Sequence, residues 1–239
     1  MTSHQPRPLG EPVEFIRPAI FPSQDTKLSG QHVTLVGLTV EHLKTFYANL
    51  AGDGNAYLWD YMSDGPFEDV NGLYEMLQPA VVSEDTIAYA IIPTGQPIAA
   101  DGADNVVGCA SYMRVDLGNR TAETGVLYSP KLQRTPAATE AMYLMARHAF
   151  EDLGYRRYEW KCDSLNAASR RTALRFGFSF EGVFRKHMIV KGKNRDTAWF
   201  AMVDEDWPDV KGALQKWLDP SNFDQSGLQR NRLEDFRKK

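Results

Sequence analysis

A mixed α/β sheet within one domain is the fold class that the sequence predicts. Segments with strand-like alternation and segments with helical periodicity follow each other along the chain, and hairpin-like connections lie near both ends of that run. The length of 239 residues suits one large domain or two small ones. Apolar residues make up 43% of the chain and charged residues 24%, which is ordinary for a globular protein.

The first half of the folded region is predicted as a strand, two helices and three strands, in the order 33–37, 40–50, 67–82, 86–92, 105–115 and 123–128. Thr39 is a favoured N-cap for the first helix, whose apolar residues fall on one face. The second helix follows a turn at 63–66. The stretch 93–104 is rich in Gly, Pro and Ala, the composition of a hairpin connection.

The second half is predicted as a helix, a strand, a helix, two strands and a closing helix, in the order 136–153, 158–162, 167–176, 178–190, 197–203 and 210–218. Small and apolar residues recur at helical spacing in the first of these helices, and Gly154 ends it. Gly177 closes the next helix in the same way. The residues 191–194 form the turn between the last two strands.

The two ends of the chain differ in composition from the part between them. Residues 1–30 carry five prolines, so an extended arm is expected, either wrapped over the domain or loose. Residues 219–239 are polar and charged and are expected to form a tail or a weakly packed helix. The folded domain is therefore placed at 31–218.

Composition also excludes several classes of function. The formal net charge of −4 argues against nucleic-acid binding, and no apolar run is long enough to span a membrane. Cys109 and Cys162 form no C-x-x-C pair, so neither a zinc site nor a disulfide framework is expected. The start of the chain lacks the features of a signal peptide. A cytoplasmic protein without a bound metal is the expectation.

The junction between the strand ending at Tyr128 and the helix beginning at Pro136 is a candidate anion site. The first turn of a helix leaves backbone N–H groups unpaired at the positive end of the helix dipole. Such an end binds a pyrophosphate readily. Every strand-to-helix junction offers something similar, so this signal alone does not identify a ligand.

Three segments, taken in order, resemble the GNAT acyl-CoA N-acyltransferases, most closely the RimJ/RimL-type ribosomal-protein N-terminal acetyltransferases. Ala122-Glu-Thr-Gly-Val-Leu-Tyr-Ser-Pro130 is similar to the family strand A-E-I-G-Y-x-L-x-P, and Gln133-Arg-Thr-Pro-Ala-Ala138 to the phosphate loop Q/R-x-x-G-x-G/A. Asn166-Ala-Ala-Ser169, followed eight residues on by Gly177-Phe178, matches the later N-x-x-S and G-F motif. The resemblance covers about residues 31–206.

The resemblance implies a single-domain GNAT fold, with acetyl-CoA as the cofactor and CoA as a product. The cofactor-binding residues that it implies are Leu127, Tyr128, Gln133, Arg134, Thr135, Pro136, Ala137, Ala138, Asn166 and Ser169. Pro136 replaces the first loop glycine of the family, which removes one N–H donor. Proline is tolerated at the first helical position, and Thr135 is a suitable cap, so the loop keeps its shape with fewer phosphate contacts. Asn166 would both contact the pantetheine arm and cap the following helix.

Two residues are candidates for catalysis. Ser169 matches the serine near the cofactor sulfur and would protonate the thiolate, its alternative being an ordinary small helix residue. Glu123 is the candidate general base, directly or through a water, its alternative being a strand residue with a cross-strand partner. Asp196 is a second candidate acid or substrate anchor. Ala173 stands where many relatives carry a tyrosine, which excludes a tyrosine acid from this helix.

The acceptor side is expected around Trp59, Tyr61 and Phe67, with His187 on the strand after the cofactor helix, although these aromatic side chains could equally be packing residues. His148 is expected to be a surface or packing residue. The predicted reaction is direct transfer of an acetyl group to a primary amine, with a small-molecule amine favoured over a protein N-terminus. The alternative is a catalytically silent acyl-CoA-binding module. The sequence leaves open whether the protein is a monomer or a homodimer.

Overall fold

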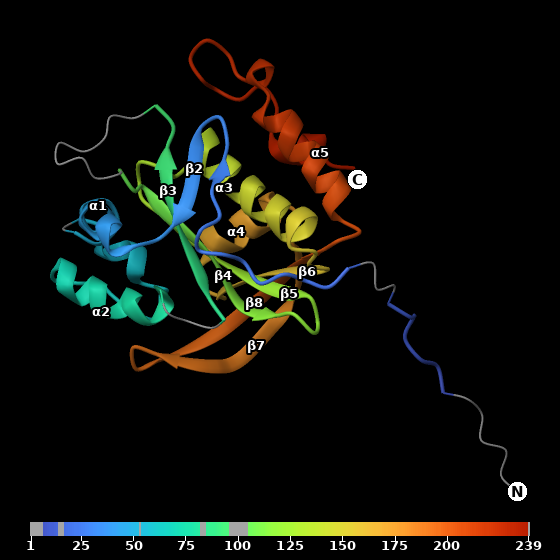
Figure 1. Ribbon diagram of the computed structural model, residues 1–239, viewed down its shortest axis with the longest axis horizontal. Coiled ribbons are helices and arrows are strands. Elements are labelled where there is room, and N and C mark those ends of the chain that lie inside the picture. The colour runs from blue at the N-terminus through green and yellow to red at the C-terminus, as the bar shows by residue number, and fades with distance from the viewer. Residues whose placement is uncertain (1–6, 14–16, 53, 82–84, 96–104, 239) are drawn as a thin grey trace, which may run out of the picture.

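The computed structural model describes residues 7–13, 17–52, 54–81, 85–95 and 105–238 (Figure 1). In this part of the chain eight strands form one sheet in the order β1-β2-β3-β4-β5-β6-β8-β7. Neighbouring strands are antiparallel except for the parallel pair β5 and β6. The predicted fold class is confirmed. The strands are β1 (Leu28–Ser29), β2 (Val33–Gly37), β3 (Ile87–Pro93), β4 (Gly108–Asp116), β5 (Thr121–Tyr128), β6 (Arg157–Asp163), β7 (Ser179–Val190) and β8 (Lys193–Val203).

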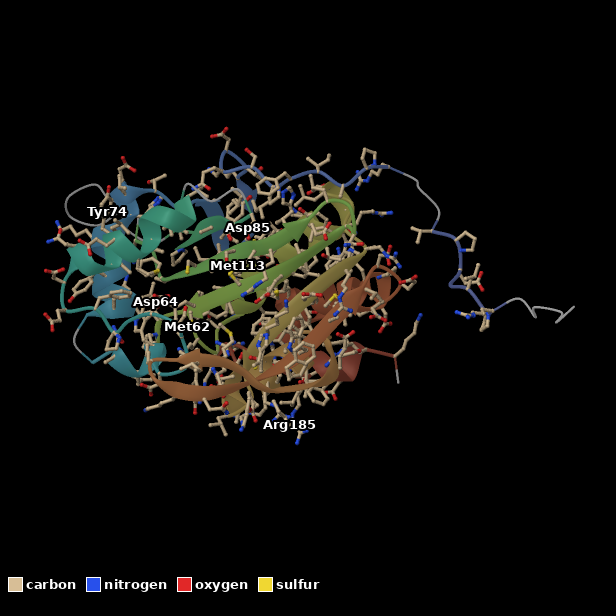
Figure 2. All side chains as sticks on the ribbon, turned by 90° about the horizontal axis from the view of Figure 1, so that it is seen from below. Met62, Asp64, Tyr74, Asp85, Met113 and Arg185 are labelled. Carbon is tan, nitrogen blue, oxygen red and sulfur yellow. The ribbon has the colours of Figure 1, made fainter. Side chains whose placement is uncertain are left out.

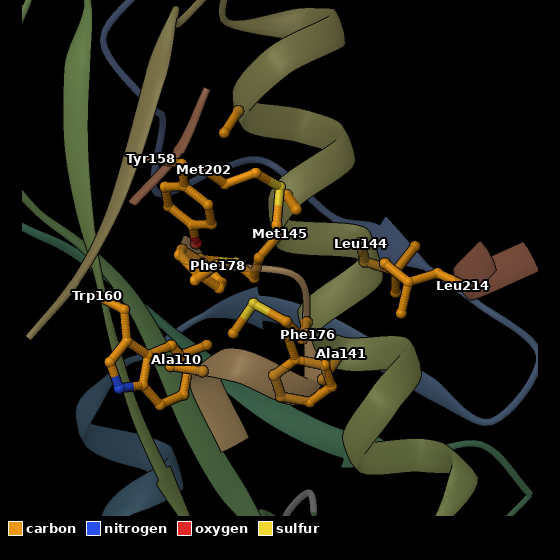
Figure 3. Close-up of a cluster of buried hydrophobic side chains, with 14 of the residues drawn as sticks. Ala110, Ala141, Leu144, Met145, Tyr158, Trp160, Phe176, Phe178, Met202 and Leu214 are labelled. Carbon is orange, nitrogen blue, oxygen red and sulfur yellow. The ribbon is translucent and has the colours of Figure 1, made fainter. Parts of the chain in front are cut away.

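Helices cover both faces of this sheet (Figure 1). On one face lie α3 (Pro136–Arg147) and α4 (Ala167–Arg175), with α5 (Trp207–Leu218) packed against α3. Figure 3 shows Met145 of α3 among the aromatic side chains of the strands, and Leu144 facing Leu214 of α5. On the other face, α1 (Leu43–Phe46) and α2 (Val70–Val81) cover a second apolar cluster over β2, β3 and β4.

The alternation along β6 sorts its side chains between the two faces. Tyr158, Trp160 and Cys162 are buried toward α3 and α4. The intervening Glu159 and Lys161 point to the opposite face, because successive side chains of a strand alternate. The charged residues of β6 therefore lie on the side of the sheet away from α3.

The parallel strands β5 and β6 pair over only half their length. Their register runs from Thr121 opposite Arg157 to Thr124 opposite Trp160. Beyond this point β5 continues to Tyr128 paired with β4 alone, and β6 continues paired with β8 alone. The two strands thus part in the middle of the sheet, and the opening lies beside α4 and the start of α3.

The proline-rich arm is extended and lies on the domain from residue 17 onward. The Ile20 amide donates to the carbonyl of Leu153 (2.9 Å), and the Tyr89 hydroxyl donates to the carbonyl of Ser23 (2.8 Å). The end of the predicted arm forms β1 and pairs with β2. Residues 1–6 and 14–16 of the arm, and 96–104 of the predicted hairpin connection, lie outside the described residues.

Residues 219–238, called here the C-terminal segment, fold back beside α5. Leu233 is only 1% exposed and belongs to the main core. Phe223 packs edge-on against Trp217 of α5 with ring centroids 5.2 Å apart. Two short 3-10 turns, Pro220–Asn222 and Leu233–Phe236, shape the segment. The residues predicted as a tail are therefore packed against the domain.

Several elements differ in extent from the prediction. The helix predicted at 40–50 consists of a 3-10 turn, the short α1 and a π-helical turn, Tyr47–Ala51. The helix α2 begins at Val70 rather than at residue 67, and α5 begins at Trp207 rather than at residue 210. The helix predicted at 136–153 continues after α3 as a wider π-helical turn, His148–Asp152. The last strand begins at Lys193 rather than at residue 197, because Lys191 and Gly192 form a two-residue turn with φ of 49° and 72°. Such a turn matches the twist of the flanking strands and lets pairing start directly after it.

Candidate functional site

A cavity of about 740 Å³ lies where β5 and β6 part. The end of β5, Trp160 of β6, the start of α3 and one side of α4 form its walls. Seven of the predicted cofactor residues from the β5–α3 connection line it, and so does Ser169. Those seven are Leu127, Tyr128, Gln133, Arg134, Thr135, Pro136 and Ala138. The parted strands thus place eight of the ten predicted cofactor residues around one opening, all but Ala137 and Asn166.

The loop before α3 presents backbone donors to this cavity. The Thr135 hydroxyl accepts from the Ala138 amide (3.2 Å) and donates to the Leu132 carbonyl (2.6 Å), as an N-cap should. Pro136 stands at the start of the helix, where the missing N–H disrupts no helical bond. The backbone N–H groups of Arg134, Thr135 and Ala137 have no partner within the described part of the chain. This donor set fits an anion such as a pyrophosphate.

Ser169 is held at the parting of the strands by two hydrogen bonds. The Asn166 side-chain oxygen accepts from the Ser169 amide (3.0 Å), so Asn166 caps α4. The Trp160 indole N–H donates to the Ser169 hydroxyl oxygen (2.9 Å). Because an indole can only donate, the hydroxyl hydrogen of Ser169 is left for another acceptor. Asn166 itself does not line the cavity.

One neighbour of Ser169 is the Cys162 thiol. Burial raises the pKa of this thiol, and a hydrogen bond with Ser169 opposes that rise. Burial also raises the pKa of Cys109, to about 12. Both thiols are thus neutral near pH 7, and a neutral thiol is a poor nucleophile.

Glu123 lies on the opposite face of the sheet within a cluster of charges. Its carboxylate is buried and contacts Arg114 Nη1 at 2.5 Å and Lys161 Nζ at 2.9 Å. Lys161 also contacts Glu159 (2.9 Å) and stands 3.7 Å from the ring centre of Trp199. The cross-strand partner that the sequence allowed as an alternative role for Glu123 is thus present.

The predicted acceptor residues lie in two segments that contact each other, residues 59–67 and the β7–β8 hairpin. Trp59 is only 2% exposed, and its indole N–H donates to the Leu50 carbonyl (2.8 Å). Phe67 packs edge-on against it at 4.8 Å, while Tyr61 is 40% exposed. The Lys191 ammonium donates to the Trp59 carbonyl (2.8 Å), which joins the β7–β8 hairpin to this segment.

Figure 2 shows Met62 and Asp64 between α2 and that hairpin. Leu58 and Met62, which the sequence analysis does not single out, line the cavity instead of the predicted aromatic residues. His187 is exposed on β7, and its Nδ1 lies 2.9 Å from the Thr197 hydroxyl.

The remaining candidates lie away from the cavity. Asp196 is exposed, and hydrogen bonds from the Lys186 amide and the Asn194 side chain lower its pKa. His148 is buried at the start of the π-helical turn after α3, next to Tyr112, with Nδ1 2.7 Å from Asp152. In the described ranges no cluster of three or more His, Cys, Asp or Glu side chains could hold a metal ion.

Several lining residues were missed by sequence reasoning. Arg171 and Arg175 of α4, Trp217 of α5, and Phe223 and Leu228 of the C-terminal segment form the far end of the cavity. The sequence around these residues contains no recognisable motif. Their place in the cavity wall therefore becomes visible only when the distant segments are packed together. None of the helices in the described residues is long and apolar enough to cross a membrane.

Comparison with known proteins agrees with this arrangement. A family model for the acetyltransferase (GNAT) domain matches residues 32–179. A crystal structure of a GCN5-related N-acetyltransferase from Brucella melitensis is 39% identical, with a TM-score of 0.85, and the match covers 92% of this chain and 97% of that one. A spermidine N-acetyltransferase from Vibrio cholerae, solved with CoA and spermine, shares the fold at 15% identity, with a TM-score of 0.60 over 75% of this chain and 99% of that one.

A relative of known acceptor matches over a shorter stretch. The ribosomal-protein-serine acetyltransferase of Escherichia coli is 27% identical over 100 residues, 42% of this chain and 56% of that protein. The chain thus spans little more than half the length of that relative. The family model, by contrast, matches well over half of this chain, and it includes the loop before α3 and the serine of α4. The chain belongs to the GNAT family of acetyltransferases.

Proposed function

We propose that the protein transfers the acetyl group of acetyl-CoA directly to a primary amine. The observation that carries the proposal is the parting of β5 and β6 around Ser169, with free backbone donors at one side of the same cavity. Acetyl-CoA supplies the activated acyl group, and the family to which the chain belongs uses that donor. The unpaired N–H groups of Arg134, Thr135 and Ala137 would hold its pyrophosphate, with the Arg134 side chain as an added charge.

Ser169 has the role of proton donor to the departing sulfur. The Trp160 indole occupies an acceptor site of the hydroxyl, which directs the hydroxyl hydrogen away from Trp160. An ordered donor lowers the barrier for departure of the thiolate by general acid catalysis. Ser169 thus acts as the acid, and Trp160 positions it.

Glu123 has the role of general base for the amine, directly or through a water. Its two cationic partners hold the carboxylate in place on the face of the sheet opposite α3. That placement implies that the acceptor approaches from the side of Met62 and the β7–β8 hairpin, while the donor enters beside α3 and α4. The two substrates would meet at the opening between the strands.

A small-molecule amine is the acceptor favoured here, and a peptide N-terminus is the second candidate. The net charge of −4 disfavours association with RNA-rich particles. A thiol-release assay over polyamines, amino acids, other small amines and N-terminal peptides tests the proposal. Turnover with small amines supports it, and turnover with peptides alone reassigns the acceptor. Binding of acetyl-CoA without turnover on any amine would support the silent module instead.

A further inference from the structure

We propose that Arg175 and the C-terminal segment form the binding site for the adenosine 3′-phosphate end of the donor, and that Arg175 makes the protein select CoA thioesters over their dephospho forms. The inference rests on the proposed use of acetyl-CoA. It concerns residues outside the matched family region, which ends at residue 179, together with one arginine inside it.

The far wall of the cavity is a pre-folded loop. The Asp224 carboxylate accepts from the Ser226 amide (2.8 Å) and the Leu228 amide (3.0 Å), which closes the turn that carries Gly227. The Trp217 indole donates to the Gln229 side chain (2.8 Å), fixing the loop to α5. Leu228 is 67% exposed at the loop tip, yet it lines the cavity. An apolar and aromatic wall of this kind suits a purine base.

Arg175 stands between this wall and the loop before α3. Its guanidinium lies 4.7 Å from the ring centre of Trp217 and donates to the Thr139 hydroxyl (3.1 Å), one turn into α3. It forms no ion pair with any described carboxylate; Glu234 and Arg237 act on it only at longer range and in opposite directions. Burial lowers the pKa of Arg175, but arginine stays protonated, so its charge is incompletely compensated.

The order of groups along the cavity matches the order of groups in the donor. Ser169 marks the thioester end and the free N–H groups before α3 mark the pyrophosphate. Arg175 ends α4, six residues after Ser169, and lines the cavity together with Leu228 of the C-terminal segment, where the nucleotide would extend. A phosphate monoester carries nearly two negative charges, and an arginine held in place recognises it through charge-assisted hydrogen bonds.

The test compares calorimetric affinities for acetyl-CoA, acetyl-dephospho-CoA and acetyl-pantetheine. The unaltered protein is expected to bind acetyl-CoA at least about 10-fold more tightly than the dephospho form, as one charge-assisted contact provides. Arg175→Met should bring that ratio close to one, because it should weaken the binding of acetyl-CoA and leave the binding of the dephospho form unchanged. Leu228→Ser should weaken both nucleotide donors about 3-fold or more and leave acetyl-pantetheine unchanged, because an apolar contact to the base is lost.

Two further variants serve as controls for the effect of Arg175→Met on this affinity ratio. Arg170→Met removes the same charge from α4 at a residue that does not line the cavity, and it should leave the ratio unchanged. Arg134→Met should weaken both nucleotide donors alike. An Arg175→Met protein that keeps the full ratio, while still releasing thiol from acetyl-CoA, overturns this inference alone. An unaltered protein that binds no acetyl-CoA overturns the proposed function and this site with it.

Discussion

The indole N–H of Trp160 donates a hydrogen bond of 2.9 Å to the hydroxyl oxygen of Ser169, where β5 and β6 part. Trp160 is the last residue of β6 in register with β5, and Ser169 lies in the first turn of α4. Ser169 thus lies where the two strands separate, its amide is bound by the cap of α4, and its hydroxyl group is held in one orientation.

Ser169→Ala should lower kcat by about 10- to 100-fold, within the lower range for acid catalysis. The affinity for acetyl-CoA should change little, because the backbone donors before α3 are untouched. Trp160→Phe keeps an aromatic side chain but removes the indole N–H, and should cause a smaller loss of kcat. Steady-state kinetics with a calorimetric Kd check both. A kcat of Ser169→Ala equal to that of the unaltered protein would return Ser169 to a packing role.

Glu123→Gln should lower kcat while leaving the Kd for acetyl-CoA nearly unchanged, because the proposed base acts on the amine. Glu159→Gln is the matched control, since Glu159 shares Lys161 with Glu123 and carries the same charge. It should leave kcat within a factor of about 3. The pH profile of kcat for both variants is the measurement. Equal profiles for the Glu123 variant and the unaltered protein would contradict the base role.

Glu140 is predicted to contribute to stability through one turn of the chain. Its carboxylate accepts from the amides of Gln31, His32 and Val33 at 2.6–3.0 Å and ties the β1–β2 turn to α3. Glu140→Gln places an NH2 group against one of these donors, and should lower the free energy of unfolding by about 1–3 kcal/mol. Urea unfolding measures it, with the exposed Glu75→Gln as control. Equal unfolding midpoints would refute the role.

Lowering the pH should decrease the free energy of unfolding, and protonation of Glu159 should account for part of this decrease. Burial raises the pKa of this carboxyl, but hydrogen bonds from Arg157 and Lys161 outweigh it, and the net shift is downward. A lowered pKa in the folded protein gives stability that is present above the unfolded value of about 4.5 and is lost as pH falls below it. Urea unfolding between pH 7 and pH 3 should show a shallower decline for Glu159→Gln. A decline as steep as in the unaltered protein would exclude this contribution.

The two cysteines should resist alkylation in the folded protein. Burial raises the pKa of Cys109 to about 12 and also raises that of Cys162, so few thiolates exist at pH 7.5. Iodoacetamide treatment followed by an activity assay should leave turnover intact. Stoichiometric inactivation protected by acetyl-CoA would instead favour a covalent acyl-enzyme and contradict direct transfer.

Local signals in the sequence predicted much of the fold. Thr135 and Asn166 were expected as helix caps, and both accept the bond from the amide three residues on. Gly154 and Gly177, predicted to end their helices, have φ of 75° and 97°. These features depend on a few neighbouring residues, which is why the sequence reveals them.

Features that depend on contacts between distant segments could not be predicted from the sequence. The contact of Lys161 with Glu123 depends on the register of two parallel strands, and pairing across a crossover leaves no local mark. The C-terminal segment is polar overall and is held by side-chain hydrogen bonds and by one buried apolar residue, Leu233, beside the buried Asn222. The segment therefore shows no hydrophobic pattern in the sequence. The cavity wall that the C-terminal segment forms beside Arg175 is visible only in the folded protein.

Calorimetric titration of the purified protein with acetyl-CoA is the first measurement to make, because it shows whether the cavity between β5 and β6 holds the acetyl donor. We expect saturable one-site binding with a micromolar Kd, weakened by Arg134→Met and by Arg175→Met. Ser169→Ala and Glu123→Gln should bind as the unaltered protein does, since they act on the reaction rather than on the donor. No heat of binding up to millimolar acetyl-CoA would mean that the loop at Pro136 does not hold the donor, and would contradict the proposed transfer.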